Sequence, residues 1–450
     1  MTDELEVLER ADRMARDYVA SVAARPAFPA SNDIEALSAF DTALPDEPND
    51  PTLTLSMLDR YATPATVTSN GPNYFGFVIG AVLPAAAAAD RLVSAWDQCA
   101  SAELNSPAAA AIEHVAAGWL LDILDLPRQA SVGFGTSATA CGLSCIATAR
   151  NALLARAGWS MDQKGLAGSP TVRVVVPATV HVTIKKILRI LGFGADNIIA
   201  AATDAFGRID PAQLPPIDAL TILCLQAGEV NTGEFDPFDE LITAAHNKGA
   251  WVHVDGAFGL WARASARYRH LTQGIERADS WTTDGHKWLN TPYDCAVAIF
   301  RDGTLAANTL NANAAYADSE PTAQKNMTLE FSRRARGVAV WAALHALGRS
   351  GVAALVDQFC NHATALADGC RALGIPVINR VVLNQVLCSF EDEQHTTQFV
   401  KAIQQQGDVW FGASRWNDKA AFRLSVSSWR TEHAHIDACL KVMARHLPAS

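Results

Sequence analysis

The sequence is poor in charged residues and has no cluster of basic ones. Charged side chains make up 18% of the 450 residues, and the formal net charge is −11. Lysine and arginine are scattered along the chain rather than gathered in one segment. Because binding to nucleic acid or to anionic lipid depends on concentrated positive charge, we expect neither a nucleic acid nor a membrane as a partner.

Cysteine is also scarce, and no two cysteines form a Cys-x-x-Cys pair. The nine cysteines are an odd number in a chain of this length, which is typical of reduced thiols rather than of a disulfide framework. Cys141 and Cys145 are spaced to share one helix face, but small buried thiols are the simpler interpretation. His433 and His435 lie two residues apart, which does not suit one helix face. We therefore expect no bound metal.

Long hydrophobic runs are missing as well. The longest run, residues 75–89, is interrupted by Gly76, Gly80 and Pro84, and it is too short to span a bilayer. Residues 1–20 combine frequent charges with an amphipathic helical pattern, which is unlike a secretion signal. These features predict a cytoplasmic enzyme, and a hydrophobic content of 49% is enough for a large core and several domains.

Three segments with different patterns divide the chain. Residues 1–70 are predicted to form a helical arm with Pro- and Asp-rich loops, suited to contact with a partner subunit. Residues 71–320 alternate short β-branched runs with helical patterns, for example strands at 173–178, 221–227 and 251–255, which predicts a large domain with a mostly parallel sheet. Residues 321–450 are predicted to form a small α+β domain.

The C-terminal segment is expected to start with a helix over residues 332–352. Gly348 and Gly351 are typical of a helix end, so we expect the helix to stop there. Alternating stretches at 377–390 and 422–429 then predict the strands of the small domain.

The first candidate for chemistry is TTDGHKWLN, residues 282–290. Lys287 follows a glycine and a histidine and precedes Trp288. An amine that is removed from water loses its proton more easily and becomes nucleophilic toward an aldehyde. An isolated lysine is more often a surface residue, so this interpretation depends on a second segment.

That second segment is HVDGAFG, residues 253–259, in which Asp255 ends an apolar strand run 32 residues before Lys287. In open α/β sheets, ligands bind outside the carboxyl ends of strands. A carboxylate there can keep a pyridinium nitrogen protonated, which pyridoxal 5′-phosphate (PLP) chemistry requires. An Asp before Gly also caps turns, but next to a candidate lysine the cofactor interpretation is favoured.

Two further segments add candidate cofactor contacts. GFGTSATACGLSC, residues 133–145, runs into a helix expected near Ala140, and a helix N-terminus with Ser137 and Thr139 suits a phosphate. It matches neither a P-loop nor GxGxxG. His181 follows the strand at 173–178, where an imidazole could lie over a cofactor ring, although an isolated histidine there is more often an ordinary helix cap.

Together these residues resemble the group II PLP-dependent decarboxylases, the fold-type I family that contains aromatic amino acid (DOPA) decarboxylase and glutamate decarboxylase. The resemblance covers about residues 70–440. Asp255 matches the acid of the family's HVDxA motif, and His286 and Lys287 match its xHKW motif. The resemblance implies an α/β fold: a mostly parallel seven-stranded-type sheet with helices on both faces, and a small C-terminal α+β domain.

The resemblance also implies roles for individual residues. His181 matches the histidine that stacks on the cofactor ring, and Ala257 matches the small residue packed against it. The phosphate-binding loop aligns with Ser137, Ala138 and Thr139.

Other positions match the substrate side of the family's active site. Tyr316, within NAAYAD (313–318), matches the family's mobile-loop tyrosine, which reprotonates the α-carbon. SRRARG (332–337) resembles the segment after that loop. GPNYFGF (71–77) resembles an aromatic motif, which implies that Tyr74, Phe75 and Phe77 line the substrate pocket.

Two positions depart from the family pattern. Asp284 stands where DOPA decarboxylase has an asparagine near the phosphate, and because an acid there would repel it, Asp284 is expected to point elsewhere or to be paired. GEVNTGEFD (228–236) replaces a Thr-rich loop, which leaves Asn231 and Thr232 as uncertain cofactor contacts.

The resemblance implies a carboxy-lyase that decarboxylates an L-amino acid to the amine and CO₂, with PLP held as a Schiff base, the internal aldimine, on Lys287. An aminotransferase is the alternative, because Arg423 could bind a substrate carboxylate; a structural ion pair explains Arg423 equally well. An aldehyde-forming decarboxylase is disfavoured by Tyr316. A catalytically inactive binding or regulatory protein is disfavoured by the intact set of cofactor residues.

The family forms homodimers with shared active sites, so a homodimer is implied as well. The substrate side chain stays open: the aromatic motif favours an apolar or aromatic amino acid, whereas Arg423 would suit an acidic one.

Overall fold

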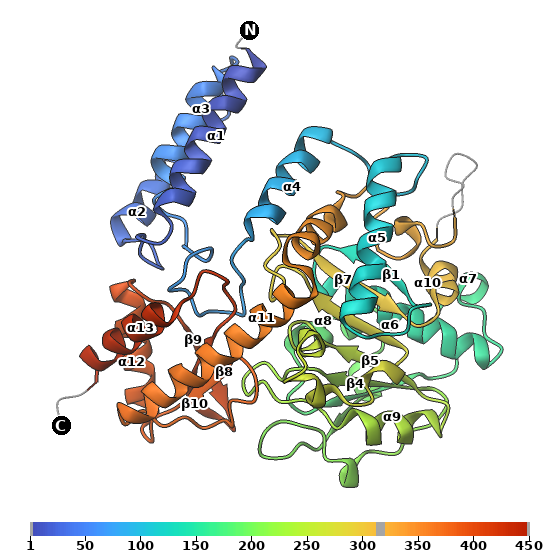
Figure 1. Cartoon of the computed structure of the whole chain (residues 1–450). Helices are drawn as coiled ribbons and strands as arrows, with labels where there is room; N and C mark the ends of the chain where they lie inside the picture. The colour runs from blue at the N-terminus through green and yellow to red at the C-terminus, as the bar shows by residue number, and fades with distance from the viewer. Residues whose placement is uncertain (1–2, 312–319, 448–450) are drawn as a thin grey trace. The chain divides into compact units, whose positions relative to one another are not determined.

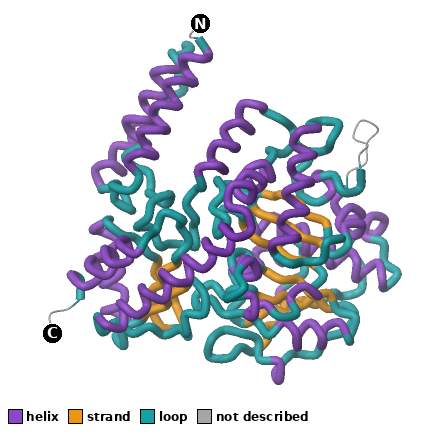
Figure 2. Tube along the Cα trace, viewed as in Figure 1, coloured by secondary structure: helices purple, strands orange, loops and turns teal. Residues whose placement is uncertain are grey.

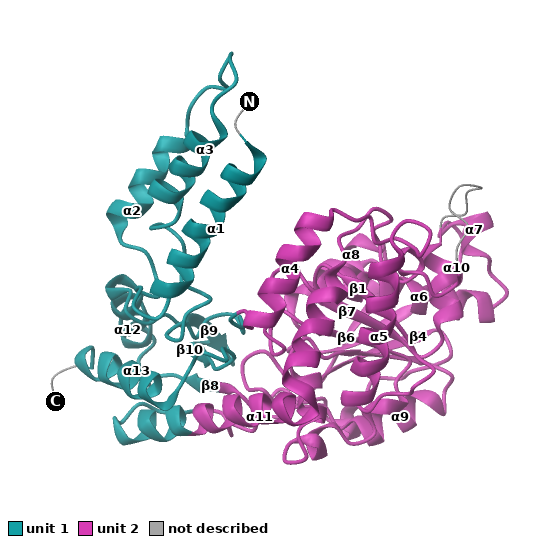
Figure 3. Cartoon of the chain, turned by 45° about the horizontal axis from the view of Figure 1, so that its top comes forward, with its two compact units in different colours: residues 1–81, 365–378, 386–450 teal, residues 82–364, 379–385 magenta. Residues whose placement is uncertain are grey.

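A computed structural model describes residues 3–311 and 320–447. The chain divides into two compact units, coloured teal and magenta in Figure 3. The first unit contains residues 1–81, 365–378 and 386–450, and the second contains residues 82–364 and 379–385.

The second unit is built on a seven-stranded sheet, with strand order β1-β7-β6-β5-β4-β2-β3 (Figures 1 and 2). Neighbours from β3 to β6 are parallel, whereas β7 is antiparallel to both β6 and β1. Because β7 alone is reversed, β1 runs in the direction of the parallel strands. The strands are β1 (Ser131–Gly135), β2 (Arg173–Pro177), β3 (Ile198–Ala201), β4 (Thr221–Gln226), β5 (Trp251–Asp255), β6 (Ser280–Asp284) and β7 (Ala296–Phe300). The predicted mostly parallel seven-stranded sheet is confirmed.

Helices pack on this sheet, and their buried side chains form a hydrophobic core together with those of the strands. The helices of this unit are α4 (Pro84–Trp96), α5 (Pro107–Ile123), α6 (Ala138–Arg156), α7 (Met161–Lys164), α8 (Val182–Ile190), α9 (Phe238–His246), α10 (Gly303–Leu310) and the first part of α11 (Arg336–Ala372), with 3₁₀ turns at Ala195–Asn197 (η3), Pro211–Gln213 (η4), Gly259–Ala264 (η5), Arg269–Thr272 (η6), Ile275–Arg277 (η7) and Gln324–Asn326 (η8). Ile146 of α6 and Ile187 of α8 pack with Val174, Ile222 and Trp251 of three strands. All six residues of β4 are buried, which is typical of a strand covered on both faces.

The first unit combines the N-terminal helices with the C-terminal sheet. Its elements are α1 (Glu4–Ser21), α2 (Ser31–Glu35), the 3₁₀ turn η1 (Ala36–Phe40), α3 (Pro51–Met57), the π-helical turn η2 (Leu58–Ala62), β8 (Gln385–Cys388), α12 (Glu393–Gln406), β9 (Gly412–Trp416), β10 (Lys419–Ser425) and α13 (His433–Arg445). The sheet order is β8-β10-β9. The small C-terminal sheet agrees with the expected fold class. The division into residues 1–70, 71–320 and 321–450 stays a prediction.

Helix α11 consists of two helices that meet at Gly348, which has non-helical dihedral angles (φ 61°, ψ 179°). Glycine reaches this conformation without a side-chain clash. The first helix therefore ends at Gly348, as predicted, whereas the second helix, which continues to Ala372, was not predicted. As a whole, α11 is long and apolar enough to cross a membrane, a property that the buried core helix of a globular protein also has. One prediction is corrected: only Gln385–Cys388 of the stretch 377–390 forms a strand.

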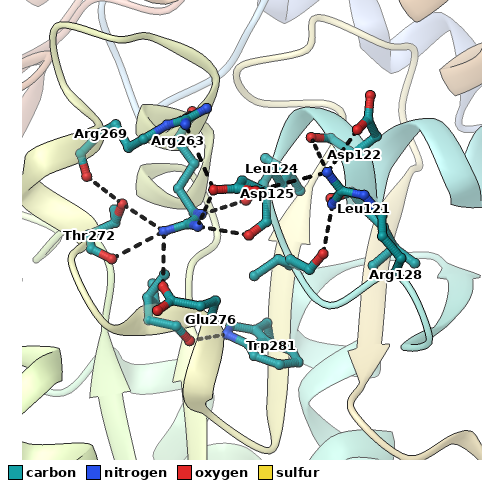
Figure 4. Close-up of polar contacts among 12 residues, drawn as sticks. Leu121, Asp122, Leu124, Asp125, Arg128, Arg263, Arg269, Thr272, Glu276 and Trp281 are labelled. Carbon is teal, nitrogen blue, oxygen red and sulfur yellow. Dashed lines mark hydrogen bonds and ion pairs between the residues drawn. The ribbon is translucent and has the colours of Figure 1, made fainter.

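A buried arginine fixes the segment that connects β5 to β6 (Figure 4). Arg263 in η5 is 3% exposed. Its guanidinium donates to the Leu124 carbonyl and to the carbonyl and carboxylate of Asp125, the latter two at 2.7 and 3.2 Å. It also donates to the Thr272 carbonyl at 3.2 Å and to the Glu276 carboxylate at 3.5 Å. A planar guanidinium with five donors can satisfy these groups at once. The connection is therefore held by polar contacts as well as by packing.

Candidate active site

The predicted cofactor residues meet at one edge of the seven-stranded sheet. Asp255 and Asp284 are the last residues of the parallel strands β5 and β6. His181 follows β2, and Ser137 follows β1, both close after the carboxyl end of the strand. Lys287 lies three residues beyond the end of β6. Since ligands of such sheets bind outside the carboxyl ends of strands, this edge is the candidate site.

Asp284 connects Lys287 to the start of α6. One carboxylate oxygen accepts a hydrogen bond from the backbone N–H of Ala138 at 2.8 Å. The other lies 2.9 Å from the Nζ atom of Lys287. The Asp284 side chain is 3% exposed and that of Lys287 is 20% exposed. Asp284 is thus paired, one of the two outcomes expected from the sequence.

His286 lies between Asp284 and the ring of Tyr293. Its Nε2 atom is 3.7 Å from the Asp284 carboxylate, and its Nδ1 atom accepts the N–H of Cys295 at 3.3 Å. The rings of His286 and Tyr293 are stacked, with centroids 4.2 Å apart. Burial lowers the pKa of His286, against the opposing charge of Asp284. A neutral imidazole is therefore favoured next to Lys287.

Tyr293 was not identified from the sequence. Its residue as a whole is 59% exposed, yet one ring face is covered by His286. Desolvation, followed by the charge of Asp284, raises the pKa of Tyr293 to about 12. The phenol is therefore protonated at neutral pH. No motif in WLNTPYDC indicated this contact, because it depends on how the chain turns back after Lys287.

Asp255 is a partly buried residue at the end of β5. Burial raises its pKa, while the nearby charges of His181 and Lys287 lower it. The backbone N–H of Ala257 donates to it at 3.2 Å. A buried carboxylate of this kind is stabilised by a cation placed against it. A pyridinium N–H is such a cation, so this carboxylate fits the ring nitrogen of PLP.

The start of α6 fits an anionic group. The helix begins at Ala138, two residues before the expected position, and the Ser137 hydroxyl caps it by accepting the N–H of Ala140 at 3.2 Å. Ala138 and Thr139 stand in its first turn, where backbone N–H groups have no partner within the helix. The loop is therefore both a helix cap and a suitable phosphate cradle.

His181 is the N-cap of α8, as the simpler interpretation had it. Its Nδ1 atom lies 2.7 Å from the Thr183 hydroxyl. The same ring is close enough to Asp255 to lower the pKa of that carboxylate. The cap therefore fixes the orientation of an imidazole at the candidate site.

Asn231 and Thr232 belong to a loop that is held by its own residues. The backbone N–H groups of both donate to the buried Glu229 carboxylate at 2.7 Å. The buried Asp236 accepts the N–H groups of Ile209 and Gln226 at 2.7 Å. These contacts make the loop rigid, and a contact of Asn231 with the cofactor stays a prediction.

The predicted substrate residues lie in the first unit. Tyr74 and Phe75 are buried, at 5% and 1% exposure, whereas Phe77 is 63% exposed. Tyr74 and Phe77 both stack on Trp410, with centroids 5.1 and 5.3 Å apart. Arg423 lies in β10, in register with Gly412 of β9. Tyr316 lies outside the described residues.

The comparisons with known proteins identify the family. The model of the pyridoxal-dependent decarboxylase conserved domain matches residues 34–387. Tryptophan decarboxylase 1 of Oryza sativa subsp. japonica is 29% identical, over 77% of this chain and 72% of that protein. Aromatic-L-amino-acid decarboxylase of Bacillus atrophaeus is 25% identical, over 89% of this chain and 87% of that protein.

A solved structure has the same fold. The crystal structure of Oryza sativa TDC with PLP and tryptamine matches with a TM-score of 0.91 at 23% identity, covering 99% of this chain and 98% of that one. These similarities do not favour an aminotransferase or an inactive binding protein. Since the family model spans most of the chain and the sheet edge fits the cofactor, the chain belongs to the pyridoxal-dependent decarboxylase family and is a PLP-dependent amino acid decarboxylase.

Proposed function

We propose that Lys287 binds the cofactor aldehyde and that the side chains around it hold the ring and the phosphate. The observation that carries this proposal is the meeting of Lys287, Asp284 and Asp255 at the carboxyl edge of one sheet. Lys287 is mostly buried, and its amine is held next to the start of α6. An amine in this setting can react with an aldehyde once its proton has been removed.

Asp255 keeps the cofactor's ring nitrogen protonated. Desolvation raises the pKa of its carboxylate, against the opposing charges of His181 and Lys287, and a cation placed against the carboxylate would stabilise its charged form. PLP, when bound there, supplies an electron sink for the bond that breaks at the α-carbon. His181, fixed as the cap of α8, packs over the ring, and Ala257 leaves room for the ring next to β5.

The first turn of α6 binds the cofactor phosphate. The N–H of Ala138, the hydroxyl of Thr139 and the cap residue Ser137 are the donors at this helix end. The Nε2 atom of His286 lies 3.7 Å from the same Asp284 oxygen that accepts the Ala138 N–H. Asn231, whose N–H is held by Glu229, is a further proposed cofactor contact.

The substrate is an L-amino acid, and we favour an aromatic side chain. Phe77 is the member of the aromatic motif with an exposed ring, and both relatives described above are named for aromatic substrates. Tyr74 and Phe75 support Phe77 from the core, since Tyr74 stacks on the same tryptophan. If the substrate is an acidic amino acid instead, Arg423 is the residue expected to bind its carboxylate.

We also infer a cytoplasmic homodimer with shared active sites. All nine cysteines are free thiols, which suits a reducing compartment. The N-terminal helix α1 exposes Leu5 and Leu8, at 65% and 55%. Apolar residues on an exposed helix are suited to contact with a second copy of the chain.

Two experiments test the assignment of function. Borohydride reduction of the PLP-loaded protein, followed by peptide mapping, is expected to label Lys287; a label on another lysine would overturn the assignment. A screen of L-amino acids for CO₂ release is expected to give the highest rate with an aromatic one. The highest rate with aspartate or glutamate would favour the Arg423 alternative.

The role proposed for Tyr316 is the protonation of the α-carbon after CO₂ has left. Tyr316→Phe is expected to lower amine formation while PLP stays bound. Unchanged turnover of the best substrate by the variant would reject the role.

A further inference from the structure

The Asp284 carboxylate contacts two groups that the proposed cofactor site needs. Its first oxygen takes the N–H of Ala138 at the start of α6. Its second oxygen takes the amine of Lys287. Both contacts are short, at 2.8 and 2.9 Å, and the carboxylate is almost fully buried.

This arrangement opposes the binding of a phosphorylated ligand. A helix N-terminus binds one anion well because its N–H groups and dipole favour negative charge. In this structure that anion is the side chain of Asp284. A phosphate at the same helix end would lie close to the carboxylate, and like charges repel strongly when water is excluded.

The same carboxylate also restrains the amine. The Nζ atom of Lys287 lies 2.9 Å from the Asp284 carboxylate, so this carboxylate occupies the space next to the amine that an approaching aldehyde needs. Reaction of Lys287 with any aldehyde therefore requires this ion pair to open. Asp284 thus affects phosphate binding and amine reactivity through two separate contacts.

We propose that Asp284 is a positioning residue that competes with the cofactor phosphate for the N–H of Ala138 and thereby limits how tightly this enzyme holds PLP. The inference rests on the proposed roles of Lys287 and of the first turn of α6. Its alternative is a purely structural carboxylate that caps α6 and has no effect on phosphate.

Asp284→Asn separates the two possibilities. The amide keeps the size of the side chain and an oxygen for the N–H of Ala138, but it removes the negative charge. Apparent dissociation constants for PLP and for pyridoxal, which lacks the phosphate, are measured by absorbance titration of cofactor-free wild type and variant. Release of Lys287 affects both ligands, whereas relief of repulsion affects PLP alone.

The expected result is at least about tenfold tighter binding of PLP by the variant, with a clearly smaller gain for pyridoxal. An equal gain for both ligands, no gain, or weaker PLP binding would overturn the proposal. If Asp284→Asn does not fold, Asp284→Ser provides the same test, since it also removes the charge and keeps an oxygen.

Asp302→Asn is the matched control. Asp302 caps α10 by accepting the N–H of Thr304 at 2.9 Å, so the same chemical change is made at another helix N-terminus. Its two dissociation constants are expected to equal those of wild type. Borohydride mapping of wild type is done in parallel: a failure to label Lys287 would overturn the proposed function itself, which is a different outcome from equal constants in a correctly labelled enzyme.

Discussion

Arg333 and Glu113 form a bidentate ion pair from which water is excluded. The two N–O distances are 2.7 and 3.0 Å, and the side chains are 0% and 1% exposed. Arg333 also donates to the carbonyl of Phe134 in β1 at 2.8 Å, and the N–H of Gly337 in α11 donates to Glu113 at 2.9 Å. The pair therefore joins α5, β1 and the start of α11, and it stabilises the strand that leads to Ser137.

Glu113→Gln is expected to destabilise the protein strongly. The variant leaves a buried guanidinium without its counter-charge, which typically costs about 3–5 kcal/mol of unfolding free energy. Urea denaturation followed by tryptophan fluorescence measures the change. Asp368→Asn is the control, because the Asp368–Arg371 pair is 66% and 49% exposed and is expected to contribute less than about 1 kcal/mol. Equal losses in the two variants would contradict the prediction.

Arg263→Lys is expected to loosen the connection between β5 and β6. A lysine cannot reproduce the fork that reaches the Leu124 carbonyl, Asp125 and Thr272 together. Loss of buried, charge-assisted hydrogen bonds lowers the unfolding free energy by about 3 kcal/mol. Arg277→Lys provides the comparison, since the contacts of Arg277 with Asp239 and with the Thr243 hydroxyl are exposed. Its replacement is expected to change stability by less than about 1 kcal/mol. Indistinguishable urea midpoints would reject the role of Arg263.

Tyr293 is expected to act through its ring rather than through its hydroxyl. Tyr293→Phe preserves the stack on His286, whereas Tyr293→Ala removes it, and a stacked pair is worth about 0.5–1.5 kcal/mol. We therefore expect PLP to bind several-fold more weakly to the alanine variant and about equally to the phenylalanine variant. Absorbance titration measures both. A phenylalanine variant as weak as the alanine variant would show that the hydroxyl is the important group.

Residues that end buried strands were the part of the site that the sequence could predict. The run WVHVD indicated that Asp255 closes a strand, and β5 ends there. Lys287 was identified from its motif, and the strand β6 that precedes it was not among the predicted strands. Short β-branched runs also located β2 and β4.

Contacts between distant segments could not be predicted in the same way. The N–H of Ala138 and the carboxylate of Asp284 are 146 residues apart, and spacing says nothing about which way a side chain turns at a strand end. Gly348 was correctly predicted to end a helix because glycine is favoured there, but the sequence did not indicate that a second helix follows it directly. The contact made by Asp284 depends on three-dimensional information.

His253 is expected to make the folded protein sensitive to acid. Burial lowers its pKa from 6.5 to about 3, and its Nε2 atom has no hydrogen-bond partner within the described part of the chain. Between pH 6.5 and 3 the unfolded chain binds a proton that the folded chain does not, so stability decreases as the pH falls through this window. From pH 6.5 to 5 the loss due to His253 is about 1.5 kcal/mol.

His253→Gln removes the titrating group, so the variant is expected to lose about 1.5 kcal/mol less than wild type between pH 6.5 and 5 in urea denaturation. Ser280→Ala is the control: it removes the partner of Nδ1, which lies 2.9 Å away, but leaves the imidazole buried. We expect this control to be less stable than wild type at every pH and to keep the wild-type pH slope. Parallel curves for His253→Gln and wild type would show that the acid sensitivity arises elsewhere in the chain.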